Sequence, residues 1–246
     1  MHLRQKTISI LTLVGLASIL LVPAVAKGDE GRTYKVTITN LTPGQPFTPP
    51  VLLTHTKAAG IFTLGEVASL EIQEIAENGN SMPLQTTLAS DVDVHDVVAG
   101  MAPIVPANNP GGTMFDSSAT FMITTRGKAK YLSFASMLIC TNDEFTGLDT
   151  VKLSKKKMTV FSAAYDARTE TNTEDFIDMV PPCQGLIGVS SDDMGTGMTD
   201  PLLDEDGIII PHVGIIGGDD LLPEVHGWGD PVARIVIERI SDDDDD

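Results

Sequence analysis

The chain has 246 residues, with 34 acidic and 16 basic residues and a formal net charge of −18 at pH 7. This balance argues against binding of nucleic acid, because phosphates would repel the protein. It suits an exported protein that attracts cations. The length allows one β-rich domain, and no low-complexity linker divides the chain.

Residues 1–26 have the pattern of a secretory signal peptide. Arg4 and Lys6 precede an apolar run over residues 8–22, and Ala24-Val25-Ala26 provides small residues before a cleavage site. The run is short for a membrane span, and no later stretch approaches about 20 consecutive apolar residues. We therefore expect cleavage after Ala26, no membrane insertion afterwards, and a secreted or periplasmic location. Losing two basic residues would change the net charge from −18 to −20.

Strand and helix patterns follow one another in the first half of the remaining chain. Residues 34–40 alternate apolar and polar side chains, which predicts a half-buried strand. Four prolines indicate a loop over residues 41–50, before a strand over residues 51–56 in which His55 is expected to be structural.

A helix is predicted after the second strand. Its apolar residues are spaced as on one face of a helix, and Asn78-Gly79 provides a stop signal; the apolar residues are Leu64, Ala68, Ile72, Ile75 and Ala76. A second short helix or turn is predicted over residues 81–90. In residues 91–96, Asp91, Asp93 and His95 would share one side of an extended chain. This arrangement allows a metal cluster, although a polar strand edge or loop is the simpler interpretation.

Two strands in the middle of the chain lead into acidic segments. Residues 118–125 form a strand-like run, and residues 131–139 are apolar on both faces, which is typical of a buried strand. The latter run is followed by Thr141-Asn142-Asp143-Glu144. Residues 158–165 form another strand-like run, which leads into the acidic segment 166–174. Because Ca²⁺ takes six to eight oxygen ligands, two such loops at one end of a sandwich could bind it. Ordinary solvated loops are the alternative.

Lys152, Lys155, Lys156 and Lys157 form a basic cluster between two predicted strands. A solvated turn is the simplest interpretation, and an anionic partner is the other one.

The two cysteines frame the second acidic segment. Cys140 closes the buried strand and Cys183 follows residues 166–174, so a disulfide between them would tie that segment to the strand end. The bridge would enclose about 40 residues and stabilise the fold by about 3–4 kcal/mol. The alternative is one buried and one exposed free thiol.

The C-terminal part contains candidate ligands but no catalytic motif. His212 and His226, with Asp219, Asp220 and Glu224 nearby, could form a transition-metal or hydrolytic site. The chain has no Gly-x-Ser-x-Gly elbow, no His-Glu-x-x-His and no phosphate-binding glycine loop. We therefore predict a protein without enzymatic activity, and keep a secreted metal-dependent hydrolase that uses His212 and His226 as an alternative.

The overall pattern is that of a mainly β protein. Residues 232–240 form a last alternating strand, and Asp242 to Asp246 form an acidic tail. Strands outnumber helices and turn residues recur about every ten positions, which favours an antiparallel β-sandwich with one or two short flanking helices. We expect one domain over residues 27–241, followed by the tail 242–246.

Four segments, in this order, resemble those of the spondin N-terminal domain family. They are the first strand at residues 34–40, the segment 136–149, Tyr165-Asp166-Ala167-x-Thr169-Glu170, and the last strand at residues 231–240. The resemblance implies a C2-like antiparallel β-sandwich with a Ca²⁺ site at one end. It implies Asp143, Asp166 and Glu170 as metal ligands. One departure is Arg168, where the family often has glycine.

The resemblance also implies a role in recognition. Animal relatives act in matrix and cell adhesion, so the expected partner is an extracellular or envelope protein or glycan, bound by loops at one end of the sandwich. A purely structural envelope or matrix protein, held together by the disulfide and packing, is a further alternative.

Overall fold

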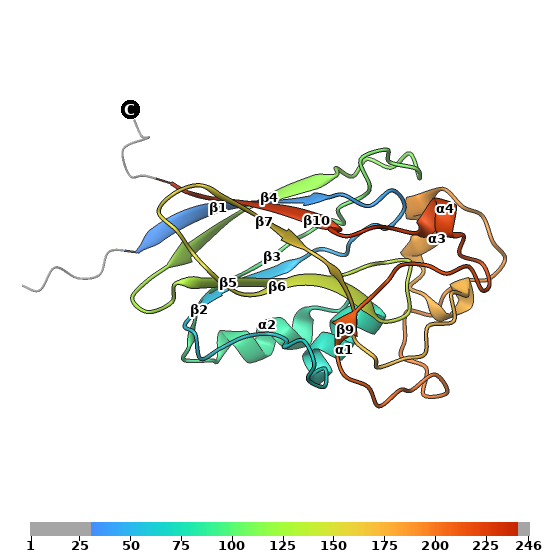
Figure 1. The fold of residues 1–246 in the computed structure, drawn as a ribbon, viewed down its shortest axis with the longest axis horizontal. Coiled ribbons are helices and arrows are strands. Elements are labelled where there is room, and N and C mark those ends of the chain that lie inside the picture. The colour runs from blue at the N-terminus through green and yellow to red at the C-terminus, as the bar shows by residue number, and fades with distance from the viewer. Residues whose placement is uncertain (1–30, 241–246) are drawn as a thin grey trace, which may run out of the picture.

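Two antiparallel sheets face each other in the computed structural model, which describes residues 31–240 (Figure 1). The four-stranded sheet has the order β4 (Ser118–Thr125), β1 (Arg32–Asn40), β10 (Ala233–Arg239) and β7 (Met158–Ser162). The six-stranded sheet has the order β3 (Val94–Ala99), β2 (Val51–His55), β5 (Tyr131–Met137), β6 (Glu144–Lys152), β8 (Ala164–Asp166) and β9 (Ile210–Pro211). The prediction of a mainly β antiparallel sandwich is confirmed.

Alternation along β1 explains its place in the centre of the smaller sheet. Val36 and Ile38 are fully buried, and the residues between them lie on the more exposed face. β1 pairs with β10 on one side and β4 on the other. The buried side chains of this sheet pack against Leu132 and Phe134 from β5, which closes the core between the two sheets.

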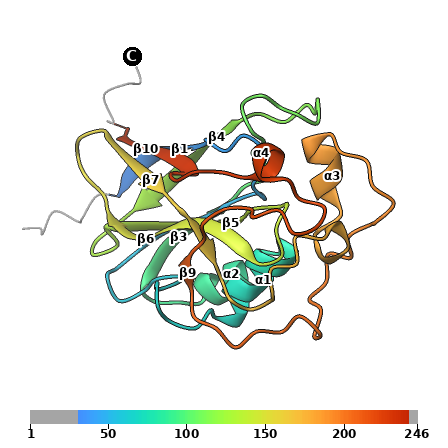
Figure 2. The same ribbon diagram turned by 45° about the vertical axis from the view of Figure 1, so that its right-hand side comes forward.

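Two helices cover the outer face of the larger sheet (Figures 1 and 2). Ile72 and Ile75 of α1 (Leu70–Asn78) belong to the same buried cluster as Leu53 and Phe145, as do Leu84 and Leu88 of α2 (Met82–Ala89). Because both faces of this sheet are covered, all residues of β2 are buried. This double burial explains why the predicted strands 51–56 and 131–139 lack a polar face.

The first helix starts later than the sequence pattern predicts. Ser69 is its N-cap and accepts a hydrogen bond from the backbone N–H of Ile72 at 3.3 Å. Leu64, which fits the helical spacing, precedes this cap and is 51% exposed. The predicted end is confirmed, since Gly79 takes a left-handed φ of 64° as the C-cap.

The single strand predicted over residues 158–165 is divided into two strands that belong to different sheets. Residues 158–162 form β7 in the smaller sheet, and residues 164–166 form β8 in the larger one, so the chain crosses the sandwich at Ala163. The strand β6 begins at Glu144, within the segment expected to be a loop. Gly147 allows this close packing, because a Cβ atom there would lie 2.5 Å from the carbonyl oxygen of Phe134.

A third cluster of buried side chains fills the loop end of the sandwich, where α3 (Pro182–Ile187), η1 (Phe176–Asp178) and α4 (Pro223–His226) lie (Figure 2). Cys140 and Cys183 are joined by a disulfide here, with a Cα–Cα distance of 5.0 Å, so the expected bridge is confirmed. Residues 188–206 contain no helix or strand.

The expected signal peptide, residues 1–26, and the acidic run 242–246 lie outside the described residues. Within residues 31–240, no helix has the length and hydrophobicity that are needed to cross a membrane.

Replacing both cysteines, Cys140→Ser with Cys183→Ser, should lower the free energy of unfolding by about 3 kcal/mol, because the open chain regains loop entropy. Chemical denaturation of the variant and of the oxidised wild type measures the difference. Reduction of the wild type by dithiothreitol should produce the same loss in the wild type and none in the variant. Equal stability of the two oxidised proteins would contradict this role of the bridge.

Candidate metal centre

Three neighbouring strands bring acidic side chains together at one end of the larger sheet. β6 and β8 pair antiparallel with Glu144 directly opposite Asp166, and Asp143 immediately precedes β6. β9 pairs with β8 on the other side and is followed by His212. The three carboxylate residues are at most 3% exposed. Such burial of neighbouring acids is costly unless a positive charge offsets it.

The two carboxylate oxygens of Asp143 have different surroundings. Its Oδ2 accepts hydrogen bonds from the backbone N–H groups of Thr169 (2.7 Å) and Glu170 (2.9 Å), so it holds the second acidic segment in place. Its Oδ1 is buried and has no hydrogen-bond partner among the described residues. The second oxygen is therefore a candidate ligand.

The two carboxylate oxygens of Glu144 also have different surroundings. Its Oε1 lies 3.0 Å from Nε2 of His212, and its Oε2 is buried without a partner in the described part of the chain. The backbone N–H of Gly214 donates to Nδ1 of His212 at 3.0 Å, so in the neutral ring the proton is on Nε2 and is donated to Glu144. His212 therefore orients Glu144 and leaves Oε2 available. The His212 ring lies beside Trp228, with 5.2 Å between their centroids.

Asp166 is held from both sides. Its Oδ1 accepts the backbone N–H of Arg168 at 2.7 Å, and its Oδ2 accepts Nδ2 of Asn172 at 3.2 Å. These bonds fix the carboxylate opposite Glu144.

The electrostatics of this cluster favour uptake of positive charge. Burial, with added repulsion from Glu144 and Asp166, raises the pKa of Asp143 to about 8. Burial and the charge of Glu144 also raise the pKa of Asp166. Burial alone would lower the pKa of His212. The hydrogen bond to Glu144 and the negative charge of Glu144 outweigh the effect of burial, so the pKa of His212 is raised. No lysine or arginine forms an ion pair with these carboxylates within residues 31–240.

Glu170 contributes its backbone to this cluster, while its carboxylate faces another group of acids. Its Oε1 accepts the backbone N–H of Asp200 at 2.7 Å. Burial raises the pKa of Glu170 to about 7, with additional repulsion from Glu77, Asp200 and Asp178. Of the three ligands that the resemblance implies, the structure thus brings the side chains of Asp143 and Asp166 together and turns that of Glu170 aside. It adds Glu144, whose role depends on the pairing of β6 with β8.

Arg168 points away from the carboxylates. Its guanidinium pairs with Glu205. Its backbone has a positive φ of 57°, a conformation that glycine adopts without strain. The departure from the expected glycine is therefore one of backbone preference, and the charge of Arg168 is paired with Glu205.

A second acidic group lies near the surface. One oxygen each from Asp175, Asp193 and Asp220 lies within 4.8 Å of the others, a spacing that the group of Asp143, Glu144 and Asp166 does not reach in the part of the chain described. Asp175 and Asp220 use carboxylate oxygens to accept the backbone N–H groups of Ile177 and Phe176. These bonds hold Asp175 and Asp220 at the turn that begins η1, and Asp193 lies beside them.

The remaining histidines named in the sequence analysis are His55, His95 and His226. His55 is buried between the carbonyl oxygen of Thr56 and the hydroxyl of Ser133. His95 is an exposed residue of β3. His226 accepts the backbone N–H of Leu222 and packs against Phe176, whereas His212 contacts Glu144 and Trp228. The two histidines of the hydrolase alternative thus have different partners.

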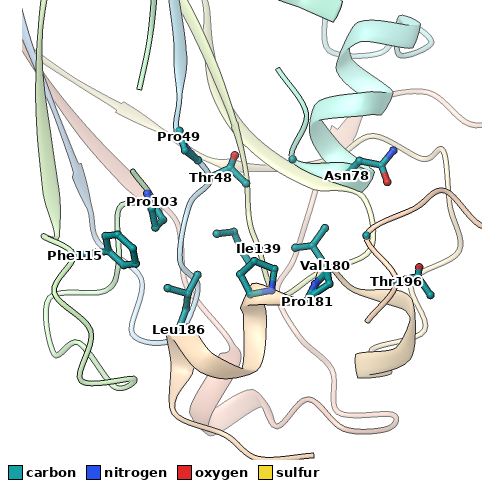
Figure 3. Close-up of a pocket in the computed structure, with 13 residues that line it drawn as sticks. Thr48, Pro49, Asn78, Pro103, Phe115, Ile139, Val180, Pro181, Leu186 and Thr196 are labelled. Atoms are coloured by element: carbon teal, nitrogen blue, oxygen red, sulfur yellow. The ribbon is translucent and has the colours of Figure 1, made fainter. Parts of the chain in front are cut away.

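An apolar pocket opens at the same end of the sandwich, and its lining includes Ile139 and Pro182, the chain neighbours of the two cysteines (Figure 3). Its volume is about 560 Å³, which is within the range of sites for small molecules or single side chains. It is lined by 13 residues, none of them charged, and four are prolines. Phe115, Ile139 and Leu186 face it, with Thr196 at its edge (Figure 3). Proline restricts the backbone, so these four lining residues have limited conformational freedom.

Comparison with known families gives one match. Residues 29–171 match the family model described as Spondin_N, which covers more than half of the chain, including both segments that supply Asp143, Glu144 and Asp166. No curated protein matches the chain.

The raised pKa of Asp143 predicts a pH-dependent stability. The folded state retains a proton that the unfolded chain releases above pH 4, so in the presence of chelator the carboxyl group should reduce stability as pH rises from about 4 to about 8. Asp143→Asn keeps an acceptor oxygen but cannot ionise. We expect the variant to gain on the order of 3–5 kcal/mol relative to the wild type between these pH values.

Urea denaturation of both proteins at a series of pH values measures this difference. Asp175→Asn, at a partly exposed aspartate outside the cluster, is the matched control and should follow the wild type. Parallel profiles for the wild type and Asp143→Asn would show that Asp143 ionises normally in the fold.

Proposed function

Since the chain belongs to the spondin N-terminal domain family, whose members are extracellular, we propose that it is a calcium-binding recognition module. In this proposal Asp143, Glu144 and Asp166 hold the ion at one end of the sandwich. The ion fixes the loops around it, and those loops bind an extracellular or envelope partner. No catalytic step is part of the proposal.

The observation that supports the proposal most is that two buried oxygens, Oδ1 of Asp143 and Oε2 of Glu144, have no hydrogen-bond partner among the described residues. In addition, no lysine or arginine within residues 31–240 forms an ion pair with this cluster. Buried acceptors are rarely left unpaired in folded proteins. A bound cation would satisfy both oxygens and offset the burial and the repulsion that raise the pKa of Asp143.

The donor atoms favour Ca²⁺ over a transition metal. His212 directs its Nε2–H to Glu144, so the atoms that remain for the ion are carboxylate oxygens. Hard cations such as Ca²⁺ prefer oxygen ligands, whereas zinc and copper sites usually include imidazole nitrogen or sulfur. Because Ca²⁺ holds its ligands at about 2.3–2.6 Å, we expect the carboxylates to move inward on binding and Asp143 to lose its proton. Backbone carbonyls and water would complete the shell.

The composition of the apolar pocket supports a protein as the proposed partner. Its four prolines and its aliphatic and aromatic side chains offer few hydrogen bonds to sugar hydroxyls. A protein that inserts an apolar side chain fits this lining better than a glycan does. Ile139, which lines the pocket, precedes Asp143 by four positions in the chain, so the pocket and the metal centre are close in sequence.

The positions of the two histidines do not support the alternative of a metal-dependent hydrolase. Its two histidines contact different residues, and His212 is occupied with positioning Glu144.

Calcium binding has a direct optical readout, because the only tryptophan, Trp228, lies beside His212. Titration of Ca²⁺ into chelator-treated protein should change Trp228 fluorescence with a stoichiometry of one. At about 100 times the dissociation constant, the ion should raise the free energy of unfolding by about 2.7 kcal/mol. Glu144→Gln should weaken binding by about tenfold or more, because it removes one charge from the ion's shell.

Calorimetry provides a second measure of the same binding. Asp220→Asn, in the surface acidic group, serves as the control and should bind as the wild type does. If Asp220→Asn removed the site while Glu144→Gln kept it, the ion would belong to the surface group instead. Absence of heat and of any stability gain would reject the calcium proposal.

The pocket can be tested with a neutral apolar fluorophore, N-phenyl-1-naphthylamine. Thr196 is exposed at the edge of the pocket, so Thr196→Trp should fill the pocket without disturbing the core. We expect the wild type to enhance fluorophore emission and the variant to bind about tenfold more weakly. Met194→Trp, at a nearby exposed residue that does not line the pocket, should retain binding. Equal binding by all three proteins would show that the pocket is not a recognition site.

A further inference from the structure

The strand β7 leaves one edge of the smaller sheet open. In the order β4-β1-β10-β7, it pairs only with β10. The carbonyl oxygen of Ser162 faces β10, because it accepts the backbone N–H of Val232 at 2.9 Å. Since the backbone groups of successive residues in a strand point to opposite sides, Thr159 and Phe161 direct theirs to the open side. Within residues 31–240, these backbone groups have no hydrogen-bond partner.

The other three edge strands have covering contacts. Asp96 of β3 accepts both the backbone N–H and the hydroxyl of Thr124 in β4, each at 2.7 Å, which joins these two edges on one side of the sandwich. At the other edge of the larger sheet, β9 contains Pro211, and Gly65 donates its N–H to the carbonyl oxygen of the preceding Ile209. The five residues of β7 include neither proline nor a charged side chain, the features that commonly block pairing at an edge.

Both faces of β7 retain apolar surface that a neighbouring strand would cover. Phe161 is 55% exposed on the outer face of the sheet. Met158 and Val160 pack against the core between the two sheets but are only partly buried, since β7 is the last strand of its sheet. Another strand beside β7 would therefore bury apolar area on both faces, in addition to pairing the backbone groups.

The sequence of β7 is complementary to itself in the antiparallel direction. When Val160 of one copy lies opposite Val160 of another, Thr159 lies opposite Phe161 of the second copy, and Met158 lies opposite Ser162. A β-branched residue beside an aromatic ring is a favourable cross-strand pair. The two Thr159–Phe161 pairs are also those whose backbone groups point outward, so they would form about four hydrogen bonds between the copies.

The charged residues next to β7 favour the antiparallel direction. Lys155, Lys156 and Lys157 immediately precede the strand, and all three are exposed. A parallel pair would place the two sets of lysines side by side, whereas an antiparallel pair places them at opposite ends, so the like charges do not face each other. Lys157 also pairs with Glu238 at 3.5 Å, which keeps it beside β10 of its own sheet.

We propose that two copies of the chain associate through their β7 edges, which joins two four-stranded sheets into one continuous antiparallel sheet. A two-fold axis passes between the two Val160 residues, so both copies contribute the same surface. Five paired residues make a small interface, and the dimer should be weak, with a dissociation constant on the order of 100 µM. The two loop ends would point in opposite directions, which suits a module that links two partners; only this last point rests on the proposed function.

Disulfide trapping tests both the contact and its register. Val160→Cys places the two introduced thiols opposite each other in a non-hydrogen-bonded pair, with Cα atoms about 4.5 Å apart, which a disulfide can bridge. Thr159→Cys is the matched control. In the proposed register the two copies of this residue are diagonal neighbours, about 7–8 Å apart, which is too far for a disulfide without movement of the backbone.

Under mild oxidation with copper phenanthroline, Val160→Cys should form covalent dimers about tenfold faster than Thr159→Cys, although Thr159 is the more exposed residue. Non-reducing electrophoresis measures the two rates, and mass spectrometry identifies the linked peptides. Equal rates, or faster linking through Thr159→Cys, would indicate random collision and overturn the proposal.

Sedimentation equilibrium at protein concentrations up to about 1 mM provides an independent test. Thr159→Pro removes an outward N–H and leaves the bonds to β10 in place, so it should raise the dissociation constant at least about tenfold while the thermal unfolding transition is retained. Phe161→Lys puts a charge on the same edge and should have a similar effect through the side chain. Thr159→Ala keeps the N–H, and its dissociation constant should stay within about twofold of the wild type.

Two results would overturn the proposal. One is a wild type that stays monomeric over the whole concentration range. The other is a dimer that persists in both Thr159→Pro and Phe161→Lys, because the copies would then associate through a different surface.

Discussion

The buried carboxylate of Asp143 is the point on which the rest of the loop end depends. One of its oxygens accepts two backbone N–H groups from the segment after β8, so the geometry of that segment follows from a single side chain. Its other oxygen shares a buried region with Glu144 and Asp166, and burial together with these like charges raises the pKa of Asp143. Folding thus places three buried carboxyl groups side by side, and the proposed cation would let them ionise together.

The surroundings of this carboxylate are rigid because covalent and hydrogen bonds converge there. Gln45 is fully buried, and its amide donates to the carbonyl oxygens of Cys140 and His226 while its Oε1 accepts the N–H of Cys140. The side chain therefore ties the proline-rich loop to the disulfide and to α4. A buried amide with both ends paired fixes the relative position of three loops that secondary structure does not hold.

How far the sequence predicts this arrangement depends on the range of the interactions involved. Alternation and stop signals locate β1, β4, β10 and the end of α1, since burial of one face and a left-handed glycine are local properties. The division of residues 158–165 into β7 and β8 is not local, because both halves are apolar and only the packing of two sheets separates them. The sequence does not predict the place of Glu144 in the cluster, for the same reason. Its place in the cluster comes from its register with Asp166 and from His212, which is 68 residues away in the sequence.

The disulfide has a consequence for when the metal centre can exist. Cys140 and Cys183 are 43 positions apart, and the ring that they close contains Asp143, Glu144, Asp166 and the backbone that Asp143 holds. In a reducing compartment that ring stays open, and the acids must find one another without covalent help. Formation of the disulfide thus couples assembly of this carboxylate cluster to an oxidising environment.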